Sequence, residues 1–252
     1  MDPGPGDEPW PHSVEQLEVA QQRLGDREPS VPPWTLPSTR PLRVGGVFVV
    51  FGRGPAGREP AWAAAVVMEE GRVIGTAVTS GEATAQYDPG HLALQRGPLL
   101  QAAVRQLRPP PDVVLVNATG RDHPRRAGLA LHLGAVLVIP TVGATDHPLA
   151  AIAPDLGPER GTAAPLELEG EVVGFVVRTR SRARPVMAHA AWRTDAETAR
   201  RVVTLVTGRA RTPEPLRLAR FLARLERARD EGRLLAAPPA IETILRPMSH
   251  RT

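Results

Sequence analysis

The sequence contains no cysteine and no lysine among its 252 residues. Without cysteine, the protein cannot form disulfide bonds, thiolate nucleophiles or cysteine-based zinc sites. Without lysine, it has no catalytic ε-amino group, and all 31 basic residues are arginine. The 27 acidic residues leave a formal net charge of +4. A charge of that size does not establish nucleic-acid binding, although clustered arginines would support it.

The sequence also lacks a membrane span, a secretory signal and two common catalytic motifs. No stretch approaches the roughly 18 consecutive apolar residues of a transmembrane helix. Residues 1–12 are acidic and rich in proline and glycine, unlike a signal peptide. Neither a Gly-x-Ser-x-Gly elbow nor a phosphate-binding loop is present. We therefore expect a cytoplasmic protein without a membrane partner.

Composition divides the chain into three regions. Residues 1–42 combine a polar tail, a short helix opened by a capping box that starts at Ser13, and a connector with five prolines. Residues 43–230 carry the apolar runs and helical patterns of one α/β domain. Residues 231–252 form a second tail.

The first half of this domain predicts strands before helices. Apolar runs predict strands at 43–51, 61–70 and 72–80, and helical spacing predicts a helix at 97–107. Within residues 111–147 we expect buried central strands at 113–116 and 136–139, with a helix opening at 123–126 between them. A mixed sheet flanked by helices follows from this order.

The second half adds a hairpin and two helices. Residues 171–180 and 184–190 predict the hairpin, and Thr194 and Pro213 open the helices. The last helix carries an arginine stripe on one side, at positions 217, 220, 224 and 227. Such a stripe is either a solvated face or a phosphate-binding surface.

Units of this kind bind ligands beyond the C-terminal ends of their strands. The stretch that follows the strand at 113–116 is therefore where we expect a site. The residues of this stretch that are expected at the site are Asn117, Gly120, Asp122 and His123.

The chain resembles the endonuclease V family of repair nucleases, which act on deaminated purines. The matching segments are 43-RVGGV-47, 87-YDPG-90, 97-GP-98, 120-GRDHPRRAGLALHLG-134, 140-PTVGA-144, 178-RTR-180, 185-PV-186 and 213-PEPLRLARFLA-223. They occur in the family's order, from about residue 13 to 229 of the chain. The resemblance implies a ribonuclease H-like α/β fold, with a five-stranded mixed sheet flanked by helices, and Mg²⁺-dependent phosphodiester hydrolysis.

The chain departs from the family at each of its catalytic positions. The three carboxylate positions hold Phe48, Arg96 and Asn117. The family's lysine position holds Asp146, and the position that resembles its late histidine holds Trp192. Mg²⁺ needs hard oxygen ligands, which Phe48 lacks, and Arg96 would repel the ion while attracting phosphate. We therefore predict no catalytic residues, no metal site and no cofactor.

A displaced metal site is the alternative to this loss, and Mg²⁺ would be its cofactor. The residues near the strand ends that could supply it are Asp88, Asp122, His123, Asp146 and His147. None of them has a recognisable ligand spacing. Roles in turns and caps explain the aspartates more simply.

Nucleic-acid contacts are the function that the resemblance leaves open. Tyr87, Pro89 and Gly90 resemble the wedge that the family inserts at a lesion, and a Pro-Gly turn with a packing tyrosine is the simpler interpretation. The candidate phosphate contacts are Arg96, Gly120, His123, Arg125 and Arg126. His123 could instead brace the chain, and the arginines could be surface charges.

Three functions remain open at this point. The leading one is an endonuclease V-like protein that has lost metal-dependent cleavage and binds nucleic acid through arginines. The second is an active endonuclease for inosine- or hypoxanthine-containing DNA or RNA, with a rebuilt metal site. The third is a scaffold for an unidentified protein partner.

Overall fold

The computed structural model describes residues 10–54, 58–83, 85 and 87–235. It contains five α-helices and eight strands within these residues. The helices are α1 (Val14–Arg27), α2 (Leu92–Arg105), α3 (Leu129–Leu137), α4 (Ala196–Leu205) and α5 (Glu214–Asp230), and a 3-10 turn spans Glu28–Ser30. The expected tails at 1–12 and 231–252 lie largely outside the described residues.

All eight strands belong to one mixed sheet in the order β3-β2-β1-β4-β5-β8-β7-β6. The strands are β1 (Arg43–Phe51), β2 (Pro60–Glu69), β3 (Arg72–Glu82), β4 (Val113–Val116), β5 (Thr141–Thr145), β6 (Ala163–Leu168), β7 (Glu171–Val177) and β8 (Val186–Ala190). Strands β1, β4 and β5 are parallel, and the other pairs are antiparallel. The mixed sheet flanked by helices is confirmed, and it has eight strands where five were expected, because β8, β7 and β6 extend it beyond β5.

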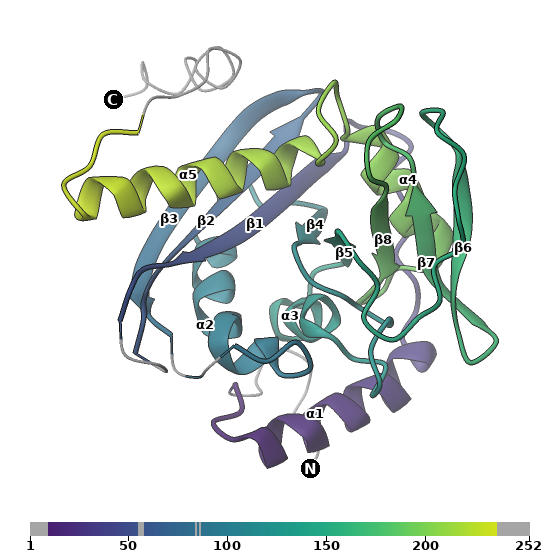
Figure 1. Cartoon of the computed structure of the whole chain (residues 1–252), viewed down its shortest axis with the longest axis horizontal. Coiled ribbons are helices and arrows are strands. Elements are labelled where there is room, and N and C mark those ends of the chain that lie inside the picture. The colour runs from purple at the N-terminus through teal and green to yellow at the C-terminus, as the bar shows by residue number, and fades with distance from the viewer. Residues whose placement is uncertain (1–9, 55–57, 84, 86, 236–252) are drawn as a thin grey trace.

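Helices cover both faces of the sheet (Figure 1). Helix α5 lies across β1 and β2, and α4 packs on β7 and β8. Helices α2 and α3 pack on the opposite face, and α1 packs on them in turn. Side chains alternate between these layers: Val47 and Val116 belong to the core under α2 and α3, whereas Phe48 packs with α5.

Two expectations within residues 111–147 were wrong. The run 136–139 is not a strand, because α3 continues to Leu137 and ends at Val138, whose φ of 57° is left-handed. A short apolar run fits a buried helix as well as a buried strand, and here the helix forms. This helix starts at Leu129 and not at 123–126, because residues 120–128 form a loop with internal contacts described below.

Most other elements match the predictions from the sequence. Ser13 caps α1, and Glu70 and Gly71 form the tight turn between β2 and β3 with positive φ angles of 50° and 76°. Helix α4 is capped by Asp195 and not by Thr194, whose hydroxyl donates to the Thr141 carbonyl instead. No helix in the described part of the chain is long and apolar enough to cross a bilayer.

Candidate nucleic-acid site at the ends of the central strands

A cavity of about 90 Å³ opens beside Phe48 of β1, at the C-terminal ends of β4 and β5. Val47 of β1 pairs with Val116 of β4 in parallel register, so Phe48 and Asn117 follow side by side. Asp146 comes directly after β5. The polar and aromatic residues that line the cavity are Phe48, Asn117, Thr145, Asp146, Arg211, Thr212 and Arg220. The structure thus brings together three of the five positions that the resemblance matches to catalytic residues, Phe48, Asn117 and Asp146.

The charges around this cavity are unsuited to a metal ion. Asp146 is its one lining carboxylate, and its Oδ1 lies 2.7 Å from Nη1 of Arg211. Arg211 also donates from Nε to the Arg184 carbonyl at 2.6 Å and from Nη2 to the Pro185 carbonyl at 2.7 Å. Among the described residues, no group of three or more histidine or acidic side chains is arranged to hold a metal. Mg²⁺ therefore does not fit these residues.

Arg220 enters the cavity from α5 and contacts Phe48. Its guanidinium carbon lies 5.5 Å from the centre of the Phe48 ring, within the range of a cation–π contact. Phe48 is half-buried and packs against the α5 core, so the ring fills space where the resemblance places a carboxylate. The Phe48 ring, with the Arg220 guanidinium against it, thus forms one wall of the cavity.

Arg96 lies on α2, between two aromatic rings. Its guanidinium carbon is 5.6 Å from the Phe51 ring centre and 5.4 Å from that of Tyr87. Burial lowers the pKa of the Arg96 guanidinium. Within the described chain it has no carboxylate partner, and its Nε donates to the neutral Gln95 side chain at 3.3 Å. Tyr87 remains 62% exposed. An aromatic surface and an unpaired cation thus adjoin each other beyond the end of β1.

Trp192 is not part of either group. It is 2% exposed, and its backbone N–H donates to Oγ1 of Thr141 at 3.2 Å. Thr141 begins β5, whereas the cavity lies beyond the other end of that strand. Sequence reasoning did not single out two lining residues: Arg211 was not considered, and Arg220 belonged only to the arginine stripe of the last helix.

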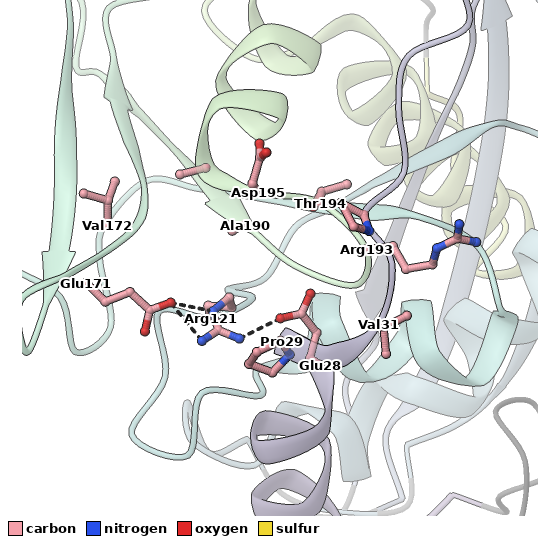
Figure 2. A pocket seen from close by; sticks show the side chains of 12 residues that line it. Glu28, Pro29, Val31, Arg121, Glu171, Val172, Ala190, Arg193, Thr194 and Asp195 are labelled. Atoms are coloured by element: carbon pink, nitrogen blue, oxygen red, sulfur yellow. Dashed lines mark hydrogen bonds and ion pairs between the residues drawn. The ribbon is translucent and has the colours of Figure 1, made fainter.

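The arginines after Gly120 are held by acids from distant parts of the chain. Arg121 lies between Glu28 and Glu171, with N–O distances of 2.6 and 2.8 Å (Figure 2). Arg126 has a left-handed φ of 56° and pairs with Glu169 at 3.0 Å and with Glu171 at 3.2 Å. These contacts tie the loop to the start of β7. Arg126 therefore has a structural role that does not require phosphate.

Gly120 is needed for close packing. A Cβ atom at this position would lie 2.0 Å from the Ala190 carbonyl oxygen. The neighbouring Arg121 N–H donates to that same oxygen at 2.8 Å. Gly120 therefore lets the loop approach the end of β8, and this explains the glycine without any ligand.

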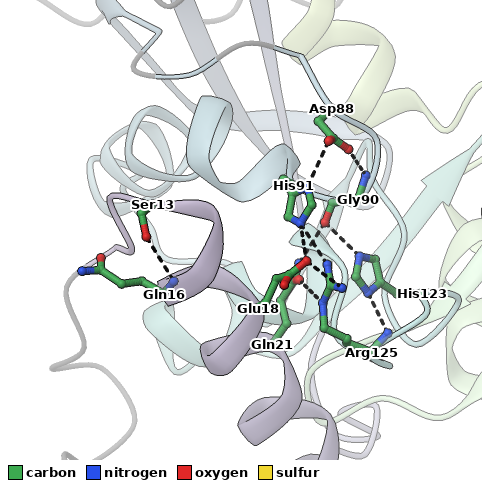
Figure 3. Close-up of polar contacts among 9 residues, drawn as sticks. All are labelled: Ser13, Gln16, Glu18, Gln21, Asp88, Gly90, His91, His123 and Arg125. Carbon is green, nitrogen blue, oxygen red and sulfur yellow. Dashed lines mark hydrogen bonds and ion pairs between the residues drawn. The ribbon is translucent and has the colours of Figure 1, made fainter.

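His123 braces the segment that contains Tyr87. Its Nε2 donates to the Gly90 carbonyl at 3.1 Å, and its Nδ1 accepts from the Arg125 N–H at 3.1 Å (Figure 3). The side chain is buried, and burial lowers its pKa to about 4, so it is neutral near pH 7. Gln21 of α1 also donates to the Gly90 carbonyl, at 3.2 Å. His123 thus fixes the turn at Asp88–Gly90 through its hydrogen bond to the Gly90 carbonyl.

Arg125 joins the same network from the side (Figure 3). It pairs with Glu18 of α1 at 3.1 Å, and its Nε donates to Gln21 at 2.8 Å. His91 lies 3.0 Å from both Glu18 and Asp88. Helix α1 is therefore connected to the turn at Asp88–Gly90 through several polar contacts. Pro89, within that turn, is exposed.

The acids considered for a displaced metal site have other partners. Asp122 is fully buried and accepts backbone N–H groups from Leu149, Ala150 and Ala151 at 2.7–2.8 Å. Asp88 accepts from the Gly90 N–H at 2.8 Å, and contact with His91 lowers the pKa of its carboxyl. Nε2 of His147 lies 3.1 Å from Arg184, and the neighbouring Asp146 pairs with Arg211. These contacts favour the roles in turns and caps.

Comparison with known proteins identifies the same family as the motifs did. The family model described as endonuclease V matches residues 35–221. A curated endonuclease V from Streptomyces avermitilis is 35% identical over 221 residues, covering 85% of this chain and 93% of that protein. One from Methanopyrus kandleri is 40% identical over 172 residues, covering 68% of this chain and 74% of that protein.

Solved structures agree with this result. The crystal structure of the Streptomyces avermitilis protein superposes with a TM-score of 0.76 at 34% identity, covering 88% of this chain and 96% of that chain. The catalytic domain of human endonuclease V gives a TM-score of 0.76 at 29% identity, covering 87% and 99%. Endonuclease V from Ciona intestinalis, in complex with inosine-containing DNA, gives 0.69 at 20% identity, covering 86% and 98%, which supports the fold alone. The expected ribonuclease H-like fold is confirmed.

Proposed function

The chain belongs to the endonuclease V family, and we propose that it binds nucleic acid without the family's metal-dependent cleavage. The observation that carries this proposal is the cavity at the ends of the central strands. Phe48 and Asn117 occupy it where the family resemblance places carboxylates, and its one lining carboxylate is paired with Arg211. An ion that requires several oxygen ligands has too few there.

Nucleic-acid binding is the part of the family's function that these residues still support. The Ciona intestinalis relative was crystallised with DNA that contains inosine. In this chain, exposed Tyr87 offers a face for a base, and Arg96 beside it offers a charge for a phosphate. Base–aromatic stacking and phosphate neutralisation together account for much of single-strand binding in other proteins. Cleavage and binding therefore rest on different residues here.

A cleavage assay tests the catalytic half of the proposal. A labelled strand that contains one inosine, as DNA and as RNA, is incubated with the protein and Mg²⁺ or Mn²⁺. We expect no metal-dependent nicking above a mock preparation, whereas a relative that keeps all three carboxylates should cut the same strand. Nicking that is lost on chelation would support the active endonuclease instead.

A titration at several salt concentrations tests the binding half. We expect the affinity for single-stranded oligonucleotides to fall as salt rises, because binding releases counterions from the phosphates. An oligonucleotide affinity that is absent, or that does not respond to salt, would favour the protein-partner scaffold.

A further inference from the structure

The proposed loss of the carboxylates changes the sign of the charge in the cavity as well as the ligands that it offers. Arg211 and Arg220 line it together with one acid, Asp146, so its formal charge is positive. We infer that this cavity is a binding site for a phosphate oxyanion that requires no metal ion. The inference rests on the proposed loss of the metal site and specifies what the same place binds instead.

Arg220 is the cation that is free to bind a ligand. Its side chain is exposed, and among the described residues it contacts no acid, only the Phe48 ring at 5.5 Å. The ring holds one face of the guanidinium and leaves its N–H edge for a ligand. A planar guanidinium donates two parallel hydrogen bonds to a phosphate, which a point charge cannot do.

The start of α5 adds a second attraction for an anion. Pro213 and Leu216 line the cavity, and no side chain caps this 17-residue helix. The N-terminus of a helix carries a partial positive charge. Here the Glu214 N–H already donates to the Val206 carbonyl at 2.9 Å and Pro215 has no N–H, so the attraction comes from the helix dipole. Glu214 in the first turn opposes this effect, but its carboxylate is paired with Arg217 at 2.5 Å. The helix end therefore reinforces Arg220.

The other residues of the cavity determine how strongly it attracts a phosphate. Asn117 contributes an amide, which can donate hydrogen bonds without adding negative charge. Asp146 would repel a phosphate, but Arg211 lies 2.7 Å from it and is fixed by two backbone carbonyls. Phe48, Ala144 and Val186 form apolar walls that reduce screening by water. The net result is a partly enclosed cationic site.

Titration of the full-length protein with inorganic phosphate tests the inference. The protein is kept in a chelator, and binding is followed by calorimetry and by the unfolding midpoint, with sodium chloride at matched ionic strength as the reference. We expect saturable phosphate binding, weakened at least about tenfold in Arg220→Ala because a charge-assisted hydrogen bond is lost. Asp146→Asn should strengthen binding.

Arg224→Ala is the matched control, because Arg224 is an exposed arginine one turn further along α5 that does not line the cavity. It should bind phosphate like the wild type. Equal phosphate affinity in Arg220→Ala and the wild type, or no binding beyond the chloride reference, would overturn the inference. The salt titration with oligonucleotides would still test nucleic-acid binding independently of this result.

Two further ligands identify the source of the phosphate. A 5′-mononucleotide and a short oligonucleotide are titrated against the wild type and Arg220→Ala. If only the oligonucleotide responds to the substitution as phosphate does, the site serves a nucleic-acid backbone. If the mononucleotide responds as well, it serves free phosphate esters. Chelator-sensitive Mg²⁺ binding that depends on Asp146 would contradict the proposed function and this inference together.

Discussion

Phe48 and Asn117 stand where the family resemblance places carboxylates, and the proposed loss of cleavage rests on these side chains. Val47 and Val116, the residues just before them, pair in parallel register, and Phe48 and Asn117 both line the cavity. Where the resemblance implies carboxylates, the wall offers an aromatic ring and an amide. The consequence is testable by reversing the substitutions.

We predict that the triple variant Phe48→Asp, Arg96→Glu, Asn117→Asp gains Mg²⁺ binding, and with it metal-dependent nicking of an inosine-containing strand. No single substitution should suffice, because one carboxylate cannot hold the ion against neighbouring arginines. The measurement is the nicking assay with and without chelator, beside Mg²⁺ calorimetry. The same variant should lose phosphate binding. A triple variant that folds yet binds no Mg²⁺ would contradict this account of the site.

Arg96 is predicted to act through both its charge and its contact with Tyr87. Replacing it by alanine removes one phosphate partner and the guanidinium that the Tyr87 ring lies against. Oligonucleotide affinity should fall about tenfold, and the slope of log affinity against log salt should decrease by about one unit. Arg105→Ala, an exposed arginine near the end of the same helix, is the control and should leave the slope unchanged.

The residues that surround the site were predictable to different degrees. Asn117 directly follows the strand predicted at 113–116, and Phe48 lies within the one predicted at 43–51. Asp146 was matched through the resemblance, because the strand expected before it, at 136–139, is part of a helix and its end. The sequence left His123 as a brace or a phosphate contact, and Arg125 and Arg126 as surface charges or phosphate contacts, because their partners are distant in sequence. Glu18 reaches Arg125 from α1, and Glu169 reaches Arg126 from the β6–β7 turn. Pairings of that range cannot be read from local pattern.

At the scale of elements, α5 is positioned by its contact with β1. A Cβ atom on Gly46 would lie 2.4 Å from the Pro215 carbonyl carbon, so the first turn of the helix rests on this glycine. The same turn carries Leu216 and leads to Arg220, both of which line the cavity. The glycine therefore sets the distance between the helix and the strand ends.

We predict that Gly46→Ala lowers the free energy of unfolding by about 1–3 kcal/mol, as expected for overpacking against backbone. Because α5 must move, phosphate binding should weaken as well. Gly45→Ala is the control: it faces the other side of β1, where the nearest atoms are side-chain atoms of Pro111 and Val114 at 3.1 Å. Chemical denaturation and phosphate titration measure both effects. Equal losses in the two variants would contradict the role given to Gly46.

Element prediction succeeded where turn signals bound an apolar run, and it failed in one buried stretch without such signals. The three strands from Arg43 onward are bounded by clear turn signals, and their positions were confirmed. In the stretch after Gly128 almost every residue is buried, so α3 shows no polar face from which its period could be recognised. The short strand β6 was not predicted, since its single buried residue, Leu166, gives little pattern.

At the scale of the whole molecule, stability should depend on pH through buried histidines. Burial lowers the pKa of His123, His132 and His189 to about 4 in the folded protein. An unfolded histidine titrates near 6.5, so the unfolded chain takes up protons first as the pH falls. The free energy of unfolding should therefore decrease between about pH 6.5 and pH 4, by at most about 1.4 kcal/mol per pH unit for each histidine. Below that window these groups add no further loss.

His132→Leu isolates one of these contributions. His132 lies fully buried against Trp10, with ring centres 4.7 Å apart, and its Nδ1 has no hydrogen-bond partner. We expect a shallower pH dependence in this variant, measured as the denaturation free energy across the acidic range. A slope equal to that of the wild type would show that His132 titrates normally in the folded state.

The order of the strands has a mechanical consequence. Only three residue pairs join β4 to β5, and the cavity lies at the end of this join. Arg220 belongs to a helix seated on β1 and β2, whereas Arg211 is fastened to the carbonyls just before β8. An anion bound by both arginines would link the two parts of the sheet, β3-β2-β1-β4 and β5-β8-β7-β6, across the pair of strands with the fewest paired residues. Occupancy of the cavity would then stiffen the molecule as a whole, and hydrogen exchange in β6 and β7, far from the ligand, would report it.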